Sequence, residues 1–133
     1  MKRDRDSVVL TLPVSVRGTI VLAHGSRDPL WRQPIEAVAE RIRQMAPAVH
    51  VCCAYLEATP PDLPGATAEL AKRGATAITV VPLFLGMGRH ARNDLPILMA
   101  ALRASHPGIV FDLRPALGEE SEMIELMAKI ALS

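Results

Sequence analysis

The chain has 133 residues, of which half are hydrophobic and only 3% are aromatic, and its 15 basic residues nearly balance its 14 acidic ones. A chain of this length suits one compact domain that buries roughly 60% of its unfolded surface, so it needs no metal or disulfide to hold its fold. The net charge of +1 gives no indication of a nucleic-acid or membrane partner, and so few aromatic side chains argue against stacking on bases.

The first sixteen residues do not have the pattern of a secretory signal, because Asp4 and Asp6 interrupt the basic start and Pro13 falls in the short apolar part. We therefore expect residues 1–16 to form a loosely ordered extension and residues 17–133 to form a single domain. No apolar run approaches the roughly 20 residues that a membrane-spanning helix needs.

The only two cysteines, Cys52 and Cys53, are neighbours in an apolar run. Neighbouring strand positions point to opposite faces of a sheet, so the two thiols are not expected to pair with each other. We interpret both as reduced packing residues of the kind found in the cytoplasm, where disulfides are rare. The sequence therefore predicts a cytoplasmic protein.

The first part of the chain predicts a strand followed by a helix. The strand covers residues 17–23 and ends just before His24. Asp28 and Pro29 are typical of a helix entrance, with an N-cap side chain followed by proline in the first turn, and Pro47 ends this helix. Apolar residues recur in it at helical spacing, at Trp31, Ile35, Val38, Ala39, Ile42 and Met45.

The middle of the chain repeats this pattern. A second strand is predicted over residues 48–56, and Asp62 caps a second helix that Gly74 closes. The third strand, over residues 75–85, is apolar throughout its centre, and a loop with two glycines follows it at residues 86–92. This part therefore predicts a second strand and helix and then a third strand.

The last part of the chain predicts a third helix, a fourth strand and a fourth helix. Asn93 or Asp94 is expected to open the third helix, because both are good N-cap residues. The fourth strand covers residues 108–113, and the last helix covers residues 119–132. We expect four apolar residues of this last helix to face inward, namely Met123, Ile124, Met127 and Ile130.

Strands that alternate with helices of this length predict an α/β fold with a parallel sheet and helices on both faces. With right-handed crossovers, the simplest arrangement is a four-stranded sheet in the order 2-1-3-4, which is half of a flavodoxin-like fold. Binding sites in such sheets lie beyond the carboxyl ends of the strands, near the point where the winding direction reverses. This rule selects the loops after His24, Leu56 and Leu85.

Those three loops contain His24, Glu57 and His90, each within a few residues of a strand end. Two imidazoles and one carboxylate suit a divalent transition metal such as cobalt, iron, nickel or zinc, and three protein ligands leave coordination positions open for reaction. Either imidazole can also accept a proton near neutral pH. The alternative is that each histidine is a hydrogen-bonded structural residue and that Glu57 is a solvated acid.

Our interpretation of His50 and His106 is structural, because His50 opens a strand and His106 lies in a turn. Around the candidate loops lie arginines that can recognise carboxylates through their forked guanidinium groups, although a solvated rim is the commoner fate of arginine. Leu85 and Met87 can form an apolar wall close to His90, or can simply fill the core. The candidate substrate-binding residues are Ser26, Arg27, Leu85, Met87, Arg89 and Arg92.

Two other enzyme classes find little support in these residues. A hydrolase with Ser26 as its nucleophile would need a nucleophile elbow of the G-x-S-x-G type, and the sequence has none. No glycine-rich nucleotide loop of the Walker or Rossmann type is present either. A phosphate-handling enzyme that uses the helix after Asp28 stays open as a minor alternative.

Three stretches, "LAHGSRDP", "AYLEATPPDLP" and "VVPLFLGMGRHARNDLP", resemble the short sirohydrochlorin chelatases of the cobalamin and siroheme pathways. These belong to the class II chelatases, which need no ATP. The resemblance covers most of the chain from Gly18 onward and implies an enzyme that inserts Co²⁺ or Fe²⁺ into sirohydrochlorin, on a flavodoxin-like chelatase half. It implies no cofactor beyond the substrate metal, which is Co²⁺, Fe²⁺ or Ni²⁺.

Carried over by position, the resemblance implies that His24 and His90 bind the metal and accept protons, and that Glu57 is their acidic partner. Short members of this family pair as homodimers, so a dimer is implied here as well. A chelatase removes two inner N–H protons from the macrocycle as the metal enters, and histidine can serve as both ligand and proton acceptor. The alternative from another class is a non-catalytic carrier of metal or tetrapyrrole on the same fold.

Overall fold

The computed structural model describes residues 15–133, and the prediction of a loose extension falls almost wholly on residues 1–14, outside the described range. Val16 is tied to the domain, since its N–H donates to Thr76 Oγ1 at 3.0 Å and its carbonyl accepts from the Thr76 N–H at 2.8 Å. The elements are β1 (Arg17–Ala23), α2 (Pro29–Met45), β2 (His50–Tyr55), α3 (Leu63–Lys72), β3 (Ala77–Pro82), α4 (Arg89–Ser105), β4 (Val110–Leu113), η1 (Leu117–Glu119) and α5 (Ser121–Leu132).

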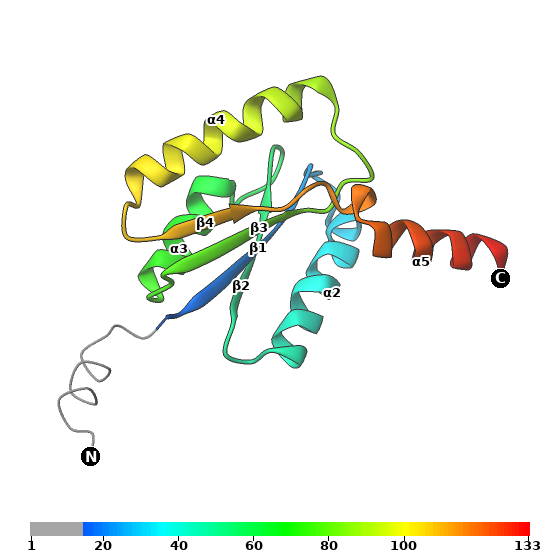
Figure 1. The fold of residues 1–133 in the computed structure, drawn as a ribbon, viewed down its shortest axis with the longest axis horizontal. Coiled ribbons are helices and arrows are strands. Elements are labelled where there is room, and N and C mark those ends of the chain that lie inside the picture. The colour runs from blue at the N-terminus through cyan, green and yellow to red at the C-terminus, as the bar shows by residue number, and fades with distance from the viewer. Residues whose placement is uncertain (1–14) are drawn as a thin grey trace, which may run out of the picture.

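The four strands form one parallel sheet in the order β2-β1-β3-β4, which confirms the predicted order 2-1-3-4 (Figure 1). The central strand β1 pairs with both β2 and β3, so Leu22 lies opposite Ala54 on one side and Pro82 on the other. The loops that leave β1, β2 and β3 therefore start side by side at one edge of the sheet.

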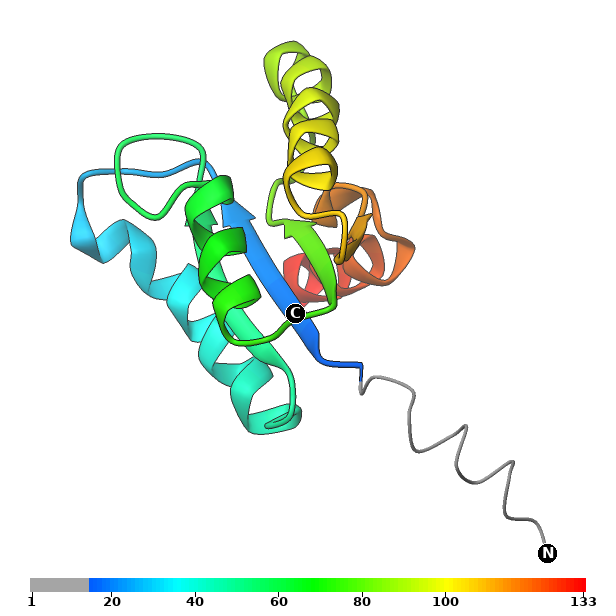
Figure 2. The same ribbon diagram turned by 90° about the vertical axis from the view of Figure 1, so that its left-hand side faces the viewer.

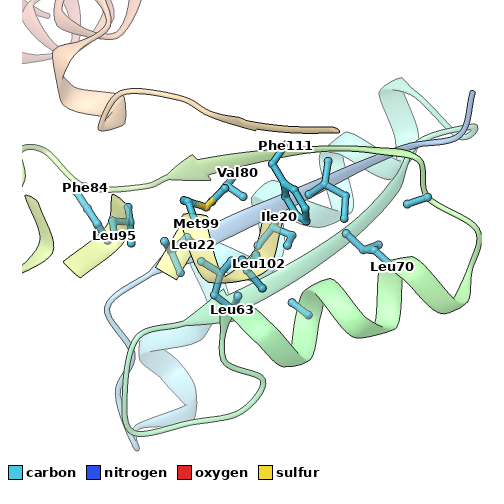
Figure 3. Close-up of a cluster of buried hydrophobic side chains, with 14 of the residues drawn as sticks. Ile20, Leu22, Leu63, Leu70, Val80, Phe84, Leu95, Met99, Leu102 and Phe111 are labelled. Carbon is cyan, nitrogen blue, oxygen red and sulfur yellow. The ribbon is translucent and has the colours of Figure 1, made fainter. Parts of the chain in front are cut away.

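Helices cover both faces of the sheet, as predicted, but not equally (Figures 1 and 2). One face packs against α3 and α4 and forms the main core, which Figure 3 shows around Ile20, Leu22 and Val80. The other face holds a small cluster of Val21, Val51 and the α2 residue Ala39. Ala39 is the one fully buried residue of α2.

The N-caps predicted for α2 and α3 are confirmed. Asp28 Oδ1 accepts a hydrogen bond from the Leu30 N–H at 2.9 Å, and Asp62 Oδ1 accepts one from the Gly65 N–H at 2.9 Å. Each satisfies a backbone donor that the first turn of a helix leaves free. The helix α2 ends at Met45, just before Pro47, also as predicted.

The prediction that Asn93 or Asp94 opens the third helix is wrong. The helix α4 begins at Arg89 with Gly88 as its N-cap, and its first backbone bond runs from the Arg92 N–H to the Gly88 carbonyl at 3.0 Å. Glycine tolerates the cap position, so the stronger cap residues lie inside the helix instead. As a result His90 sits on the first turn of a helix and not in a loop.

The inward face predicted for the last helix is wrong for Ile124 and Ile130, whereas Met123 and Met127 are half-buried. No residue of α5 is buried, and Ile124 and Ile130 are more than half exposed. In Figure 1 this helix runs out from the sheet beyond η1, so its apolar residues lie outside the core. None of the helices within residues 15–133 is both long enough and apolar enough to cross a membrane.

Cys52 and Cys53 are both free, and they pack against opposite faces of the sheet, as the alternation of strand positions predicts. Burial raises the pKa of both thiols above the ordinary value, which keeps them protonated and unreactive near neutral pH. This agrees with their interpretation as packing residues.

Candidate active site

The loop after β1 and the loop after β2 continue the pairing of their strands. The Leu56 N–H donates to the Ala23 carbonyl at 3.0 Å, and the Glu57 N–H donates to the His24 carbonyl at 3.0 Å. These bonds lie past the last paired residues of the two strands. They hold His24 and Glu57 side by side at the carboxyl edge of the sheet, although 33 residues separate them (57 minus 24).

Gly25 allows this close approach. Its φ of 108° lies in a region that L side chains rarely adopt, and a Cβ at this position would collide with the carbonyl oxygen of Glu57. On the other loop, Ala58 has a φ of 70°, a left-handed conformation that is uncommon for alanine. The two loops are therefore held in a fixed and partly strained arrangement around Glu57.

The imidazole of His24 lies against the ring of Phe84. The ring centroids are 4.3 Å apart and the planes are tilted by 24°, so the two rings are stacked. Phe84 follows β3 and is only 4% exposed, whereas His24 is exposed. The stack connects the loop after β1 to the loop after β3.

His90 reaches the same region from the start of α4. The loop between β3 and α4 includes Gly86 and Gly88, and the helix then begins at Arg89. One turn further along α4 lies Asp94, in the i+4 position that shares a helix face with His90. The start of α4 thus presents an imidazole and a carboxylate on one face.

These side chains line one pocket of about 310 Å³. Its polar residues are His24, Glu57, His90 and Asp94, and its apolar wall consists of Leu56, Ala91, Leu95 and Leu98. The structure therefore brings together the three residues that the sequence places at separate strand ends. The pocket also contains Asp94, which the sequence indicates only as a helix cap. Phe84 stacks on His24, although nothing in its apolar run indicates such a contact.

The pocket is not a closed metal site. Among residues 15–133, no three histidine, cysteine, aspartate or glutamate side chains lie close enough together to hold a metal ion. His24, Glu57 and His90 are all exposed, so their side chains keep rotameric freedom. The arrangement places two imidazoles and two carboxylates around an open space, unlike the preformed ligand shell of a structural metal.

None of the six residues predicted to bind substrate lines this pocket. Ser26 Oγ accepts a hydrogen bond from the Asp28 N–H at 3.1 Å, which braces the turn into α2. Arg92 Nη1 donates to the Met87 carbonyl at 3.3 Å, and Met87 packs against the core. Three others, Arg27, Leu85 and Arg89, are exposed in the loops and at the first position of α4.

A second and wider pocket lies beside the first. It has a volume of about 600 Å³ and is lined by the loop between β2 and α3, from Tyr55 to Asp62, together with Gly65. Leu56 and Glu57 line both pockets. The two cavities therefore share a wall, and Glu57 lies at their boundary.

The fold and the pocket together define an open α/β domain with a ligand pocket at the carboxyl edge of its sheet, where sites in such folds occur. The sequence profile of the CbiX family matches residues 18–131. The chain therefore belongs to the CbiX family, which confirms the resemblance found in its sequence.

Relatives and solved structures agree with this assignment. The sirohydrochlorin cobaltochelatase of Methanopyrus kandleri is 34% identical over 80 residues, which are 60% of this chain and 56% of the relative. The chain thus spans little more than half the length of this curated relative. A structure described as a cobalamin (vitamin B12) biosynthesis CbiX protein from Marinobacter aquaeolei VT8 is 31% identical with a TM-score of 0.74, covering 87% of this chain and 94% of that one.

A further solved structure contains a bound metal. The sirohydrochlorin chelatase SirB from Bacillus subtilis subspecies spizizenii, solved in complex with cobalt, is 26% identical with a TM-score of 0.73. The match covers 87% of this chain and 50% of SirB. The domain described here therefore corresponds to about half of that chelatase.

Proposed function

We propose that this protein inserts Co²⁺ or Fe²⁺ into sirohydrochlorin. The observation that carries the proposal is the convergence of His24, Glu57 and His90 on one pocket of a CbiX-family domain. The cobaltochelatase relatives and the cobalt complex of SirB support the same reaction class and metal.

The proposed reaction conserves charge. A divalent cation enters the macrocycle, and two protons leave its inner nitrogens, so no oxidant or reductant is needed. We assign the binding of the cation and the acceptance of the protons to His24 and His90, because a neutral imidazole can do either. Glu57 and Asp94 supply two carboxylates in the same pocket, which match the charge of the arriving cation.

An incomplete set of protein ligands suits a metal that must be transferred to a substrate. A site that grips its ion with four fixed ligands is structural, whereas a transferring site keeps coordination positions free. Among the described residues no three candidate ligands are preassembled. We therefore propose that the protein binds the cation weakly. Water fills the remaining coordination positions until the macrocycle replaces it.

The macrocycle itself needs more room than the small pocket. Known ligand pockets measure roughly 300–1,000 Å³, and the wider pocket on the other side of Leu56 and Glu57 has a volume of about 600 Å³. Sirohydrochlorin is flat and carries carboxylate arms, which arginine binds well. We assign these arms to Arg27, Arg89 and Arg92, which are exposed and lie within three residues of His24 or His90 in the sequence.

We further propose that the protein acts in the cytoplasm as a homodimer. Its two free thiols suit a reducing compartment. The exposed apolar residues of α5 lie beside a groove of about 480 Å³ against the uncovered part of the sheet. A second copy of the chain would cover this surface.

The test is an insertion assay with purified protein, sirohydrochlorin and Co²⁺, followed by the absorbance of the tetrapyrrole. We expect wild-type protein to insert metal over many turnovers and His24→Ala or His90→Ala to lower the rate at least about 100-fold, the usual contribution of a group that transfers protons. His106→Ala is the matched control, because His106 lies at the other end of α4, and it should keep wild-type activity.

Two results would overturn the proposal. A wild-type rate no faster than that of the metal and macrocycle alone would rule out an enzyme. A single turnover with the product retained in equal amount would favour the alternative, a carrier on the same fold.

A further inference from the structure

The contact between His24 and Phe84 suggests how the pocket holds its first imidazole. The ring of His24 is stacked on Phe84, with centroids 4.3 Å apart. Within residues 15–133 no hydrogen bond to either ring nitrogen of His24 is found, and only its backbone carbonyl is bonded, to the Glu57 N–H. Among the described residues the ring of His24 is thus held by this stack and by no hydrogen bond.

An exposed histidine needs such a restraint if it is to act on a metal. The χ2 angle of histidine has a broad preference, so the ring plane is not determined by the side chain alone. The lone pair of each ring nitrogen lies in that plane, so the plane decides the direction from which a cation is bound. Metal-binding histidines are usually oriented by a hydrogen bond from the second nitrogen, and here a ring face takes that place.

Phe84 is well suited to serve as a rigid support. It is only 4% exposed and belongs to the main core, where Figure 3 shows it at one end of the cluster beside Leu95. Its carbonyl accepts a hydrogen bond from the Gly118 N–H at 2.9 Å, and the preceding Leu83 N–H donates to the Leu22 carbonyl at 2.8 Å. The backbone on which its ring depends is thus held from both sides.

The packing of Gly118 strengthens this support. A Cβ at Gly118 would collide with the carbonyl of Leu85, so the turn η1 lies directly against the loop that carries Phe84. This contact joins the loop after β3 to the segment after β4. The position of Phe84 is therefore fixed by the fold and does not depend on His24.

We infer that Phe84 is the positioning residue of His24, and that it turns the edge of the imidazole, with its nitrogens, toward the space shared with His90 and Glu57. This inference rests on the proposed function, in which His24 binds the cation and accepts a proton. The inference gives Phe84 a role in the site, whereas its apolar character by itself indicates only a core residue.

The test compares the only two phenylalanines of the chain. Phe84→Leu removes the ring under His24 but keeps an apolar side chain. Phe111→Leu makes the same change in the same core cluster, at a residue that is 7% exposed and that Figure 3 shows well away from Phe84. Urea unfolding of both variants establishes the folded fraction, so that rates are compared for folded protein.

We expect Phe84→Leu to lower kcat/KM for Co²⁺ by about 10- to 100-fold, the usual range for residues that orient a metal ligand, while Phe111→Leu stays within about twofold of wild type. Equal losses in the two variants, or a wild-type rate in Phe84→Leu, would mean that Phe84 only fills the core. Measuring the rate at saturating Co²⁺ separates a change in KM from a change in kcat, because a misaligned ligand raises KM for the metal.

Proton NMR of the histidine rings gives a readout that does not depend on insertion. The ring current of Phe84 should shift the His24 ring protons, which the spectrum of His24→Ala identifies among the four histidines. This shift should vanish in Phe84→Leu and persist in Phe111→Leu. A shift that survives in Phe84→Leu overturns the positioning role even if the protein inserts metal, and its loss supports that role even if the insertion assay is negative.

Discussion

Tyr55, the only tyrosine of the chain, ends β2 just before the loop that carries Glu57. It is 3% exposed, its ring lies 6.3 Å from that of Trp31, and Cys53 lies two residues before it in the same strand. Burial, aided by Cys53, raises its pKa from 10.0 to about 12. The folded protein thus holds the neutral phenol more firmly than the unfolded chain does.

This shift predicts a loss of stability in alkaline solution. The stabilisation is complete below the unfolded pKa of 10.0 and is lost as the pH rises through the folded value of about 12, because the unfolded chain releases the proton first. Urea unfolding at stepped pH should show this loss, and Tyr55→Phe should remove the tyrosine's share while leaving the thiols in place. Tyrosinate absorbance that develops around pH 10 in the folded protein would contradict the prediction.

At this scale the sequence predicts some residues of the candidate site and misses others for a physical reason. His24, Glu57 and His90 are polar residues directly after apolar strands, a pattern that is visible without a structure. Phe84 belongs to an apolar run, and nothing local shows that its ring meets an imidazole from another loop. Asp94 joins the pocket because of the helix on which it lies.

At the scale of elements, the site depends on how closely two loops approach each other. Gly25 carries a φ of 108°, and its missing side chain makes room for the Glu57 carbonyl. Gly74 also has a positive φ, of 89°, but a Cβ there would meet nothing within 4 Å. Gly86 would meet nothing either and has no left-handed φ. Substituting these three glycines therefore distinguishes two energetic costs of an added side chain: the cost of a left-handed backbone conformation and the cost of a collision with a neighbouring loop.

We expect Gly74→Ala to lower the free energy of unfolding by about 1–3 kcal/mol, the usual cost of a non-glycine residue in such a conformation. Gly25→Ala should cost more than Gly74→Ala, because the loop of Glu57 must also move, and it should slow metal insertion. Gly86→Ala should stay within about 0.5 kcal/mol of wild type. Urea denaturation of the three variants measures these differences, and equal losses for Gly25→Ala and Gly74→Ala would show that the loops do not interlock.

The elements themselves were predictable to the extent that their signals are local. The strand order follows from alternation and handedness, and the caps Asp28 and Asp62 follow from side-chain chemistry. The start of α4 was not predictable in this way, since Gly88 caps it in place of the better cap residues further on. For α5 the apolar periodicity is real, but periodicity does not say what the apolar face packs against.

At the scale of the whole molecule, the two faces of the sheet are covered unequally. The face under α3 and α4 carries the main core, whereas the opposite face is covered by α2 over one part only. Beside the rest of that face lies the groove of about 480 Å³, lined by Thr19, Thr79 and Val81 of the sheet and by Met123 and Leu126 of α5. Such a surface is typical of an interface.

The charges at this groove suit a second copy of the same chain. The lining of the groove includes Arg17, Arg114, Glu120 and Glu122, and Arg114 already pairs with Glu120 at 2.8 Å. A twofold axis places the same surface of two copies against each other, so a surface that carries both signs can pair with itself. Covering it would bury the apolar residues of α5 that the single chain leaves exposed.

We therefore expect the wild-type protein to have twice the mass of the chain in sedimentation equilibrium, and its Tm to rise with protein concentration, because association stabilises the folded form. Leu126→Lys, at a residue of α5 that is 49% exposed, should give a monomer with an intact fold, since it disturbs no buried contact. Ile97→Lys is the matched control on α4, 69% exposed and away from the groove, and should stay dimeric. A wild-type protein that sediments as a monomer at all concentrations would leave α5 without the partner proposed for it, and dissociation by Ile97→Lys would place the interface on α4.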